Sequence, residues 1–219
     1  MAEPKKRTAV LISGRGSNLA ALIAASAHSA YPAQIALVLS NRVDAPGLGH
    51  ARDHGIPIAV VDQARCETKA EMETQFDAAL RDAEVELICL AGFMRLLSAR
   101  FVSSWHDRIL NVHPSLLPLF PGLDTHERAL AAGVKVHGAT VHFVRAEMDA
   151  GPIIAQGAVP VLAGDTPERL QQRVLRIEHR IYPLALELVA GGKARVASER
   201  VEIDGAAVTP GAALLSPPD

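Results

Sequence analysis

The sequence predicts an α/β fold, and three observations support this. Short continuous apolar runs, as at residues 8–13 and 87–91, are typical of strands buried on both faces of a parallel sheet. Helical segments separate these runs, as in βαβ units. The chain has 219 residues, 49% of them hydrophobic, which suits one large α/β domain with a sizeable core. We therefore expect a Rossmann-like open twisted sheet, mostly parallel with an antiparallel part toward the C-terminal half, and with helices on both faces.

Composition restricts the class of partner. The net charge is −2, from 22 basic and 24 acidic residues, and the only basic block is at residues 5–7, so we expect neither nucleic acid nor a membrane as partner. Small-molecule substrates are favoured instead. Cys66 and Cys89 form no CxxC motif, which indicates a reducing compartment without disulfides or a zinc site. Because no apolar run approaches the about eighteen residues of a membrane span, we expect a cytoplasmic protein.

The first expected strand, at residues 8–13, ends at a glycine turn that leads into an Ala- and Leu-rich helix. Gly16, Ser17 and Asn18 lie in this turn, which delivers backbone N–H groups to a helix N-terminus and so can bind an anion. Leu19 replaces the third glycine of the dinucleotide fingerprint, and no Walker A lysine follows, so a single phosphate group fits better. The alternative is an ordinary strand-to-helix turn with Ser17 as its N-cap.

Further strands are expected at residues 34–40 and 58–61, with a short helix between them that ends near Gly55. Thr68 and Glu71 then form a capping box for a helix to about Ala83. Lys69 lies in the first turn of that helix, where a cation opposes the helix dipole. It is either solvated or faces an anion that offsets this cost.

A fourth buried strand at residues 87–91 is followed by the segment Phe93 to Leu97. The carboxyl ends of strands in open α/β sheets are where ligands bind, so this segment is a candidate ligand rim. Its apolar side chains fit a plain core segment equally well.

A fifth strand at residues 109–113 ends in two polar side chains, Asn111 and His113, which lie on one face because side chains alternate along a strand. Pro114 restricts His113 to extended geometry. This arrangement predicts an active site at the strand end, and the alternative is an Asn and a His that only cap the strand.

The C-terminal half continues with short helices at residues 98–105 and 125–132, on either side of the fifth strand. Residues 138–144 alternate, which predicts a strand with one face less buried, and a turn-rich loop then contains Asp149. A strand at residues 153–161 is expected to be antiparallel to it. A helix from Thr166 toward Ala190 should kink at Pro183, and residues 201–208 predict a hairpin about Asp204-Gly205 before a loose tail.

The nine histidines do not predict a metal site. His137 and His142 are five residues apart on a strand and so face opposite sides. His126-Glu127 lacks the second histidine of a helical zinc motif.

The segments GRGSN, LAGFMRLL, LNVHPSLLP, PGLDTH, VHFV and MDAGPI, in this order, closely resemble the glycinamide ribonucleotide formyltransferases, the folate-dependent enzymes of purine synthesis. The NxHPSLLP segment is typical of the formyltransferase superfamily, and the GxGSN loop narrows it to the ribonucleotide enzymes. The resemblance, over about residues 8–190, implies three groups of site residues. They are the catalytic Asn111, His113 and Asp149, the ribonucleotide-binding Gly16, Ser17, Asn18, Lys69 and Glu178, and the folate-binding Met94, Arg95, Leu96 and Leu97.

The chain departs from the family pattern beyond the strand end. Leu119-Phe120 replaces the common Lys-Tyr, and Asp124 stands where His is frequent. We therefore expect no family-like substrate contact at these positions. Ala150 replaces the first glycine of Asp-Gly-Gly, a small change unless its φ is positive.

The chemistry of formyl transfer suits these residue types. When an amine attacks a formyl carbon, an oxyanion develops, to which Asn111 would donate a neutral hydrogen bond and a protonated His113 a charged one. Asp149 would favour the imidazolium and relay the amine proton. No covalent enzyme intermediate is required, and we expect Cys89 to be buried in a strand and a poor nucleophile, which agrees with direct transfer.

The resemblance also implies the domain organisation and the reaction. We expect one formyltransferase domain over residues 1–190, with a phosphate-binding part at about 8–105 and a folate and catalytic part at about 106–190, followed by a hairpin and tail at 191–219. The expected reaction transfers the formyl group of 10-formyltetrahydrofolate to glycinamide ribonucleotide, without a metal, in a monomer or homodimer. The alternatives are a formyltetrahydrofolate hydrolase, a methionyl-tRNA formyltransferase, and a catalytically silent binder of a phosphometabolite or folate.

Overall fold

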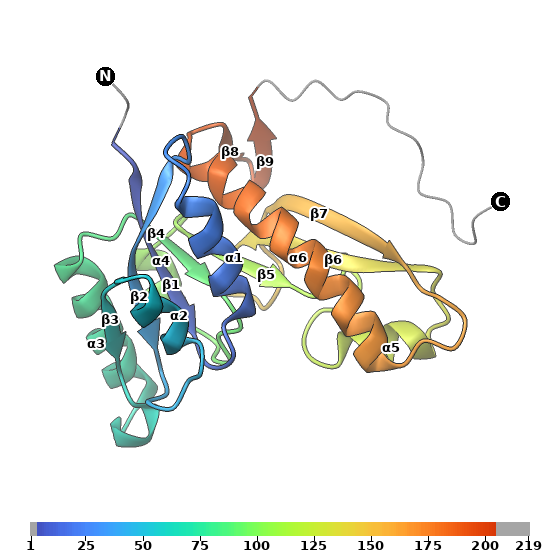
Figure 1. Cartoon of the computed structure of the whole chain (residues 1–219), viewed down its shortest axis with the longest axis horizontal. Coiled ribbons are helices and arrows are strands. Elements are labelled where there is room, and N and C mark those ends of the chain that lie inside the picture. The colour runs from blue at the N-terminus through green and yellow to red at the C-terminus, as the bar shows by residue number, and fades with distance from the viewer. Residues whose placement is uncertain (1–3, 205–219) are drawn as a thin grey trace.

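The structure is a computed structural model that describes residues 4–204. Seven strands form one sheet in the order β3-β2-β1-β4-β5-β6-β7, and β8 and β9 form a separate hairpin (Figure 1). The strands are β1 (Lys6–Ile12), β2 (Ala33–Ser40), β3 (Ile58–Val60), β4 (Leu87–Leu90), β5 (Ile109–His113), β6 (Val136–Phe143), β7 (Ile153–Pro160), β8 (Ala194–Ala197) and β9 (Arg200–Ile203). The helices are α1 (Ser17–Ser26), α2 (Leu48–Asp53), α3 (Lys69–Asp82), α4 (Ala99–Ser104), α5 (Thr125–Ala131) and α6 (Pro167–Ala190), with a 3-10 turn, η1, at Gln63–Arg65.

The direction of the strands confirms the predicted fold class. Strands β1 to β5 pair in parallel, whereas β6 is antiparallel to both β5 and β7. The chain adds β2 and β3 on one side of β1 and then β4 and β5 on the other, so the strand order reverses at β1. Such a switch point opens a crevice at the carboxyl ends of the strands.

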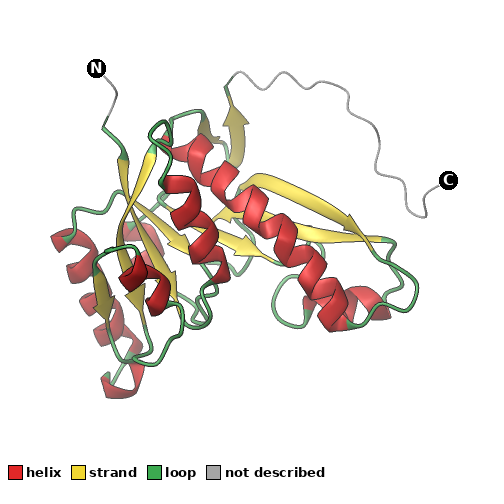
Figure 2. Ribbon diagram, in the orientation of Figure 1, coloured by secondary structure: helices red, strands yellow, loops and turns green. Residues whose placement is uncertain are grey.

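Helices cover both faces of the sheet, also as predicted (Figure 2). Val10 and Ile12 of β1 pack in the cluster that contains α1 and α6, which lie side by side on the near face in Figure 1. Ala9 and Leu11, which alternate with them, pack in the opposite cluster with Phe76 of α3. The apolar run of this strand is therefore continuous because both of its faces are buried.

The prediction that β6 has one less buried face is wrong. Every residue of β6 after Val136 is buried. One face packs against α6, since a Cβ on Gly157, which pairs with Ala139, would contact Ile177 of that helix. On the other face the chain after β5 covers the strand, where the Thr140 hydroxyl accepts the Leu117 N–H at 3.0 Å.

Two further expectations concern the C-terminal part, namely a kink at Pro183 and a hairpin about Asp204-Gly205. Helix α6 contains Pro183 and is not interrupted by it. The structure shows a hairpin with its turn at Ser198 and Glu199, which have φ of 49° and 56°, and the turn predicted about Asp204-Gly205 stays a prediction. Residues 201–203 therefore belong to the second strand of the hairpin, and Gly205 onward lies outside the described residues.

Within residues 4–204, no helix combines the length and the apolar character that crossing a membrane requires.

Candidate active site

Strand β5 presents Asn111 and His113 on one face, as its alternation predicts. Leu110 and Val112 point into the core cluster shared with α1 and α6, so the two polar residues lie on the opposite face. In the antiparallel pairing, Asn111 is opposite His142 and His113 is opposite Thr140 of β6. The strand therefore brings Asn111 and His113 beside side chains of β6 at the edge of the sheet where ligands bind.

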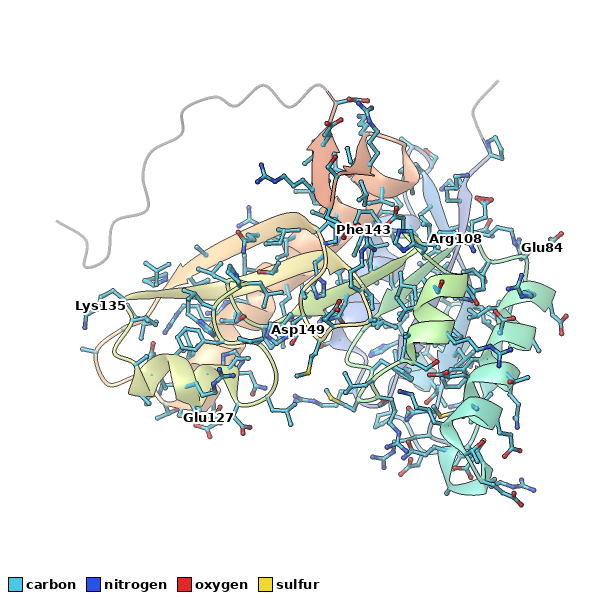
Figure 3. All side chains as sticks on the ribbon, turned by 180° about the vertical axis from the view of Figure 1, so that it is seen from behind. Glu84, Arg108, Glu127, Lys135, Phe143 and Asp149 are labelled. Carbon is cyan, nitrogen blue, oxygen red and sulfur yellow. The ribbon has the colours of Figure 1, made fainter. Side chains whose placement is uncertain are left out.

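His113 contacts Asp149, so the fold brings these two predicted catalytic residues together. His113 Nδ1 lies 3.4 Å from Asp149 Oδ2, and their side chains are only 7% and 10% exposed. The Gly122 N–H also donates to Asp149 Oδ2 at 2.8 Å. Asp149 lies in the loop after β6 (Figure 3) and has a φ of 56°, a left-handed conformation that Asp tolerates better than most residues.

The second ring nitrogen of His113 is also engaged. Nε2 lies 3.0 Å from the carbonyl oxygen of Phe120, to which a protonated Nε2 donates. Phe120 has a φ of 53°, so this carbonyl is presented by a left-handed turn of the loop that follows β5. The imidazole is thus oriented between a carboxylate on one side and a carbonyl on the other.

His142 is a site residue that sequence reasoning missed, since it was considered only as a metal ligand. Asn111 Nδ2 donates to His142 Nε2 at 3.3 Å, and His142 Nδ1 donates to its neighbour, the Phe143 carbonyl, at 2.9 Å. Burial lowers the pKa of His142, which favours the neutral ring that this pattern requires. The register of β5 against β6 was the signal that could have found it.

A cavity of about 790 Å³ adjoins these residues. Its wall contains all three predicted catalytic residues and all four predicted folate-binding residues, namely Asn111, His113, Asp149, Met94, Arg95, Leu96 and Leu97. Met94 and Leu96 are 72% and 66% exposed, so the alternative that this segment is plain core is wrong for them. Phe93 is partly buried, packs edge-on against Phe76 of the core, and also lines the cavity.

The start of this rim is fixed by a buried hydroxyl. The Met94 N–H donates to Ser13 Oγ at 2.9 Å, and Ser13 Oγ donates to Asn41 Oδ1 at 2.7 Å. Because Ser13 immediately precedes the glycine loop, one side chain links that loop to the rim of the cavity.

The predicted phosphate-binding residues form a second group at the N-terminus of α1. Gly16, not Ser17, is the N-cap, so the predicted Ser17 cap is wrong, and binding of an anion at this turn stays a prediction. Its φ is 74°, and a Cβ there would lie 2.8 Å from the Gly47 Cα, so only glycine fits. The first helical hydrogen bond runs from Ala20 N–H to Gly16 O, and the N–H groups of the preceding turn point out of the helix N-terminus.

Asn18 joins this group to α6. Asn18 Nδ2 donates to Glu178 Oε2 at 2.7 Å, and both side chains are buried. Burial raises the pKa of Glu178, and the Asn18 hydrogen bond opposes that rise only in part. Among the described residues, the buried Asn18 Oδ1 has no hydrogen-bond partner.

Lys69 lies apart from this group. It begins α3, which packs on the face of the sheet opposite to α1, and its Nζ is 4.0 Å from Glu73 Oε1 of the same helix. Its side chain is 47% exposed. The contacts of Lys69 therefore do not join it to Gly16 or Asn18, and its role in phosphate binding stays a prediction.

The departures from the family pattern lie on the loops around the cavity. Asp124 lines the cavity and is the N-cap of α5, with a φ of 55°. Leu119 is 58% exposed. The φ of Ala150 is not positive, so its methyl is tolerated, as expected.

The other histidines do not converge on a metal site. His137 lies near Phe120 and His126, whereas His142 lies near Asn111 and Asp149. Over residues 4–204, no three His, Cys, Asp or Glu side chains are arranged to hold a metal ion. That the reaction needs no metal stays a prediction.

The buried pair His126 and His137 predicts acid sensitivity. Burial lowers the pKa of His137 to about 4, below the 6.5 of an exposed ring. The unfolded chain therefore binds more protons between these two values, and the free energy of unfolding should fall as the pH decreases through that window. Denaturant titrations at several pH values should show a flatter dependence for His137→Gln. Replacing the exposed His28 with Gln is the control, and an equal slope in His137→Gln and the parent would contradict the prediction.

An amide, an imidazole and a carboxylate around one cavity of an open α/β sheet define a protein equipped for acid–base chemistry on a small molecule. Comparison with known proteins identifies the family. Residues 6–186 match the formyl transferase family model. The chain is 41% identical to the phosphoribosylglycinamide formyltransferase of Haemophilus influenzae, over 93% of this chain and 96% of that protein. The chain belongs to the formyl transferase family, which confirms the resemblance that its motifs indicate.

Two other relatives agree. The glycinamide ribonucleotide transformylase 1 of Symbiobacterium toebii has a crystal structure that matches with a TM-score of 0.89 and 46% identity, over 92% of this chain and 95% of that one. The trifunctional purine biosynthetic protein adenosine-3 of Gallus gallus is 51% identical over 88% of this chain. The chain spans only 19% of the length of that trifunctional protein.

Proposed function

We propose that the chain transfers the formyl group of 10-formyltetrahydrofolate to the amino group of glycinamide ribonucleotide, giving formylglycinamide ribonucleotide in de novo purine biosynthesis. The observation that supports this most directly is the His113–Asp149 contact at 3.4 Å, at the wall of a large cavity in a formyl transferase fold. A cytoplasmic location and a monomeric or homodimeric state complete the proposal.

Asn111 is the neutral oxyanion donor. The amine nitrogen attacks the formyl carbon, and the carbonyl oxygen becomes negatively charged as the tetrahedral intermediate forms. One N–H of the Asn111 amide is fixed by His142 at 3.3 Å, which orients the second toward the cavity. Because His142 is buried and neutral, it orients the amide without adding a competing charge.

His113 is the charged donor, and it acts through Nε2 because Nδ1 faces Asp149. For Nε2 to reach the oxyanion, the substrate must take the place of the Phe120 carbonyl, which lies 3.0 Å away in this structure. Asp149 stabilises the imidazolium and relays the proton that the amine loses. The intermediate collapses by breaking the bond to the folate nitrogen, which gains a proton as it leaves.

The folate packs along Met94, Arg95, Leu96 and Leu97, which line the cavity. The exposed apolar side chains of Met94 and Leu96 suit an aromatic ring system. The ribonucleotide phosphate binds the N–H groups at Gly16, Ser17 and Asn18, where the helix dipole favours an anion. The glycinamide end binds Glu178 and Asn18 Oδ1. Both are hydrogen-bond acceptors, and Asn18 Oδ1 has no partner within residues 4–204. Cys89 takes no part, because burial raises its pKa to about 12.

A coupled absorbance assay for folate release tests the proposal. We expect turnover only when both formyl-folate and glycinamide ribonucleotide are present. Turnover without the ribonucleotide would indicate a formyltetrahydrofolate hydrolase, which uses water as the acceptor at the same three residues. Binding of both substrates without turnover would indicate a silent binding protein.

Lys69 provides a separate prediction about the phosphate site. If it contributes to phosphate binding, Lys69→Ala should raise the ribonucleotide KM far more than the folate KM, because one charge that faces the phosphate is removed. Steady-state kinetics with each substrate varied in turn measure this difference. Lys193→Ala, in the turn before β8, is the matched control. Equal changes in both KM values would remove Lys69 from the phosphate site.

A further inference from the structure

Arg145 is a largely buried cation at the wall of the cavity, and the mechanism does not use it. It follows β6 by two residues and begins the loop at residues 144–151, which contains Asp149. Its side chain is only 11% exposed. Nη2 donates to Asp107 Oδ1 at 2.7 Å, and Nε donates to Glu199 Oε2 at 2.8 Å.

The two carboxylates come from segments far away in the sequence. Asp107 lies in the turn between α4 and β5, and Glu199 lies in the turn of the β8–β9 hairpin, with φ values of 55° and 56°. In Figure 3, the labelled Phe143 at the end of β6 lies just below this hairpin. Glu199 is outside residues 6–186, the part that matches the family model. A segment beyond the family domain therefore reaches the loop that contains the catalytic carboxylate.

The ends of this loop are held by the backbone. The Phe143 N–H donates to the Pro152 carbonyl at 2.9 Å, and Gly151 packs directly on the Phe143 carbonyl. Between these ends, the loop residues Ala146 to Asp149 line the cavity and are half-buried or exposed. The first part of the loop is held at Val144, whose N–H donates to the Ile109 carbonyl at 2.9 Å, and at Arg145, whose side chain reaches the two carboxylates.

This contact differs from an ordinary surface ion pair because the Arg145 side chain is only 11% exposed, although Asp107 and Glu199 are 39% and 65% exposed. Exposed ion pairs contribute little, because water screens both charges. A buried guanidinium left without its carboxylates is strongly unfavourable, so it would turn out into solvent and release the loop. The planar fork of Arg presents donors on separate nitrogens to the two carboxylates, and the ammonium of Lys, a single nitrogen, lacks this fixed geometry.

We propose that Arg145 is a positioning residue, which holds the loop at residues 144–151 against Asp107 and Glu199 and thereby places Asp149 beside His113. The inference rests on the proposed function for its kinetic consequences only. It assigns to the C-terminal hairpin a part in the geometry of the active site.

Three variants test this role. Arg145→Lys keeps the charge but loses the fork, and the double variant Asp107→Asn with Glu199→Gln removes both partner charges from side chains that are 39% and 65% exposed. Glu202→Gln is the matched control, since Glu202 lies on the same hairpin and pairs with the exposed Arg195 at 3.0 Å. All of them are made in the full chain.

Hydrogen–deuterium exchange should show faster exchange across residues 144–151 in Arg145→Lys and in the double variant, but not in Glu202→Gln. In the same two variants, kcat should fall by about tenfold, because a misplaced catalytic group is costly even over short distances. The folate KM should rise, since the loop lines the cavity, and the ribonucleotide KM should stay unchanged.

The inference would be overturned if the double variant matched Glu202→Gln in both exchange and kcat. A uniform increase in exchange over the whole chain would also overturn it, because that indicates general destabilisation. If Arg145→Lys does not fold, the double variant alone decides, since its substitutions are nearly isosteric and partly exposed. If the unsubstituted chain shows no turnover, the proposed function fails, and the exchange measurement still tests the loop.

Discussion

Asp149→Asn should lower kcat by roughly a hundredfold or more while both substrates still bind. The substitution keeps the shape of the side chain and its acceptor for the Gly122 N–H, but it removes the charge that lies 3.4 Å from His113 Nδ1. The backbone should not be strained, because Asn adopts the φ of 56° found here as readily as Asp. The loss should therefore fall on the chemical step and not on folding.

Steady-state kinetics, with calorimetric binding of a folate analogue and of the ribonucleotide, would separate these effects. Asp82→Asn, an exposed position at the end of α3, provides a control for the loss of one negative charge. A folded Asp149→Asn variant with nearly normal kcat would show that the carboxylate does not assist His113.

Gly151→Ala should have an effect of similar size for a steric reason. An added Cβ would lie 1.7 Å from the Phe143 carbonyl oxygen and 2.8 Å from its carbon, so the end of β6 or the loop must move. Overpacking of this kind typically costs about 1–3 kcal/mol of stability. Asp149 is two residues away, and moving it by about 1 Å would lower kcat by roughly a hundredfold.

Thermal unfolding and kcat should be measured together for this variant. Ala150→Gly is the matched control, because it changes one methyl at an exposed neighbouring position whose φ is not positive. The control should retain its Tm and kcat. Gly151→Ala with both quantities unchanged would mean that the loop relaxes without moving Asp149.

The sequence predicts the sheet and the catalytic strand well because their signals are local. Apolar runs that are buried on both faces need no knowledge of distant partners, and the alternation in β5 places Asn111 and His113 on one face. Helix starts are also local, since the Thr68 and Thr166 side chains accept N–H groups three residues ahead, as predicted. The contact between His113 and Asp149 required the family resemblance, because nothing local joins residues so far apart.

Features that depend on long-range pairing were predicted poorly. His142 becomes a site residue only through its pairing with Asn111. The full burial of β6 depends on a loop that folds back over it. The hairpin turn at Ser198 and Glu199 has positive φ without a Gly or Asn to signal it, so the sequence indicates only the nearby Asp-Gly pair as a turn.

The hydrogen bond between Asn18 and Glu178 has a consequence for the order of folding. It spans 160 residues, so this part of the site cannot exist until α6 docks against α1. We expect contacts of such long range to form late, because closing a long loop is entropically unfavourable before other contacts compensate. A ligand that bridges the two helices binds only the completed fold, and by mass action it shifts the chain away from states in which α6 has detached. Under the proposed function, substrate bound beside Asn18 and Glu178 would hold together α1 and α6, the first and the last helix of residues 4–204.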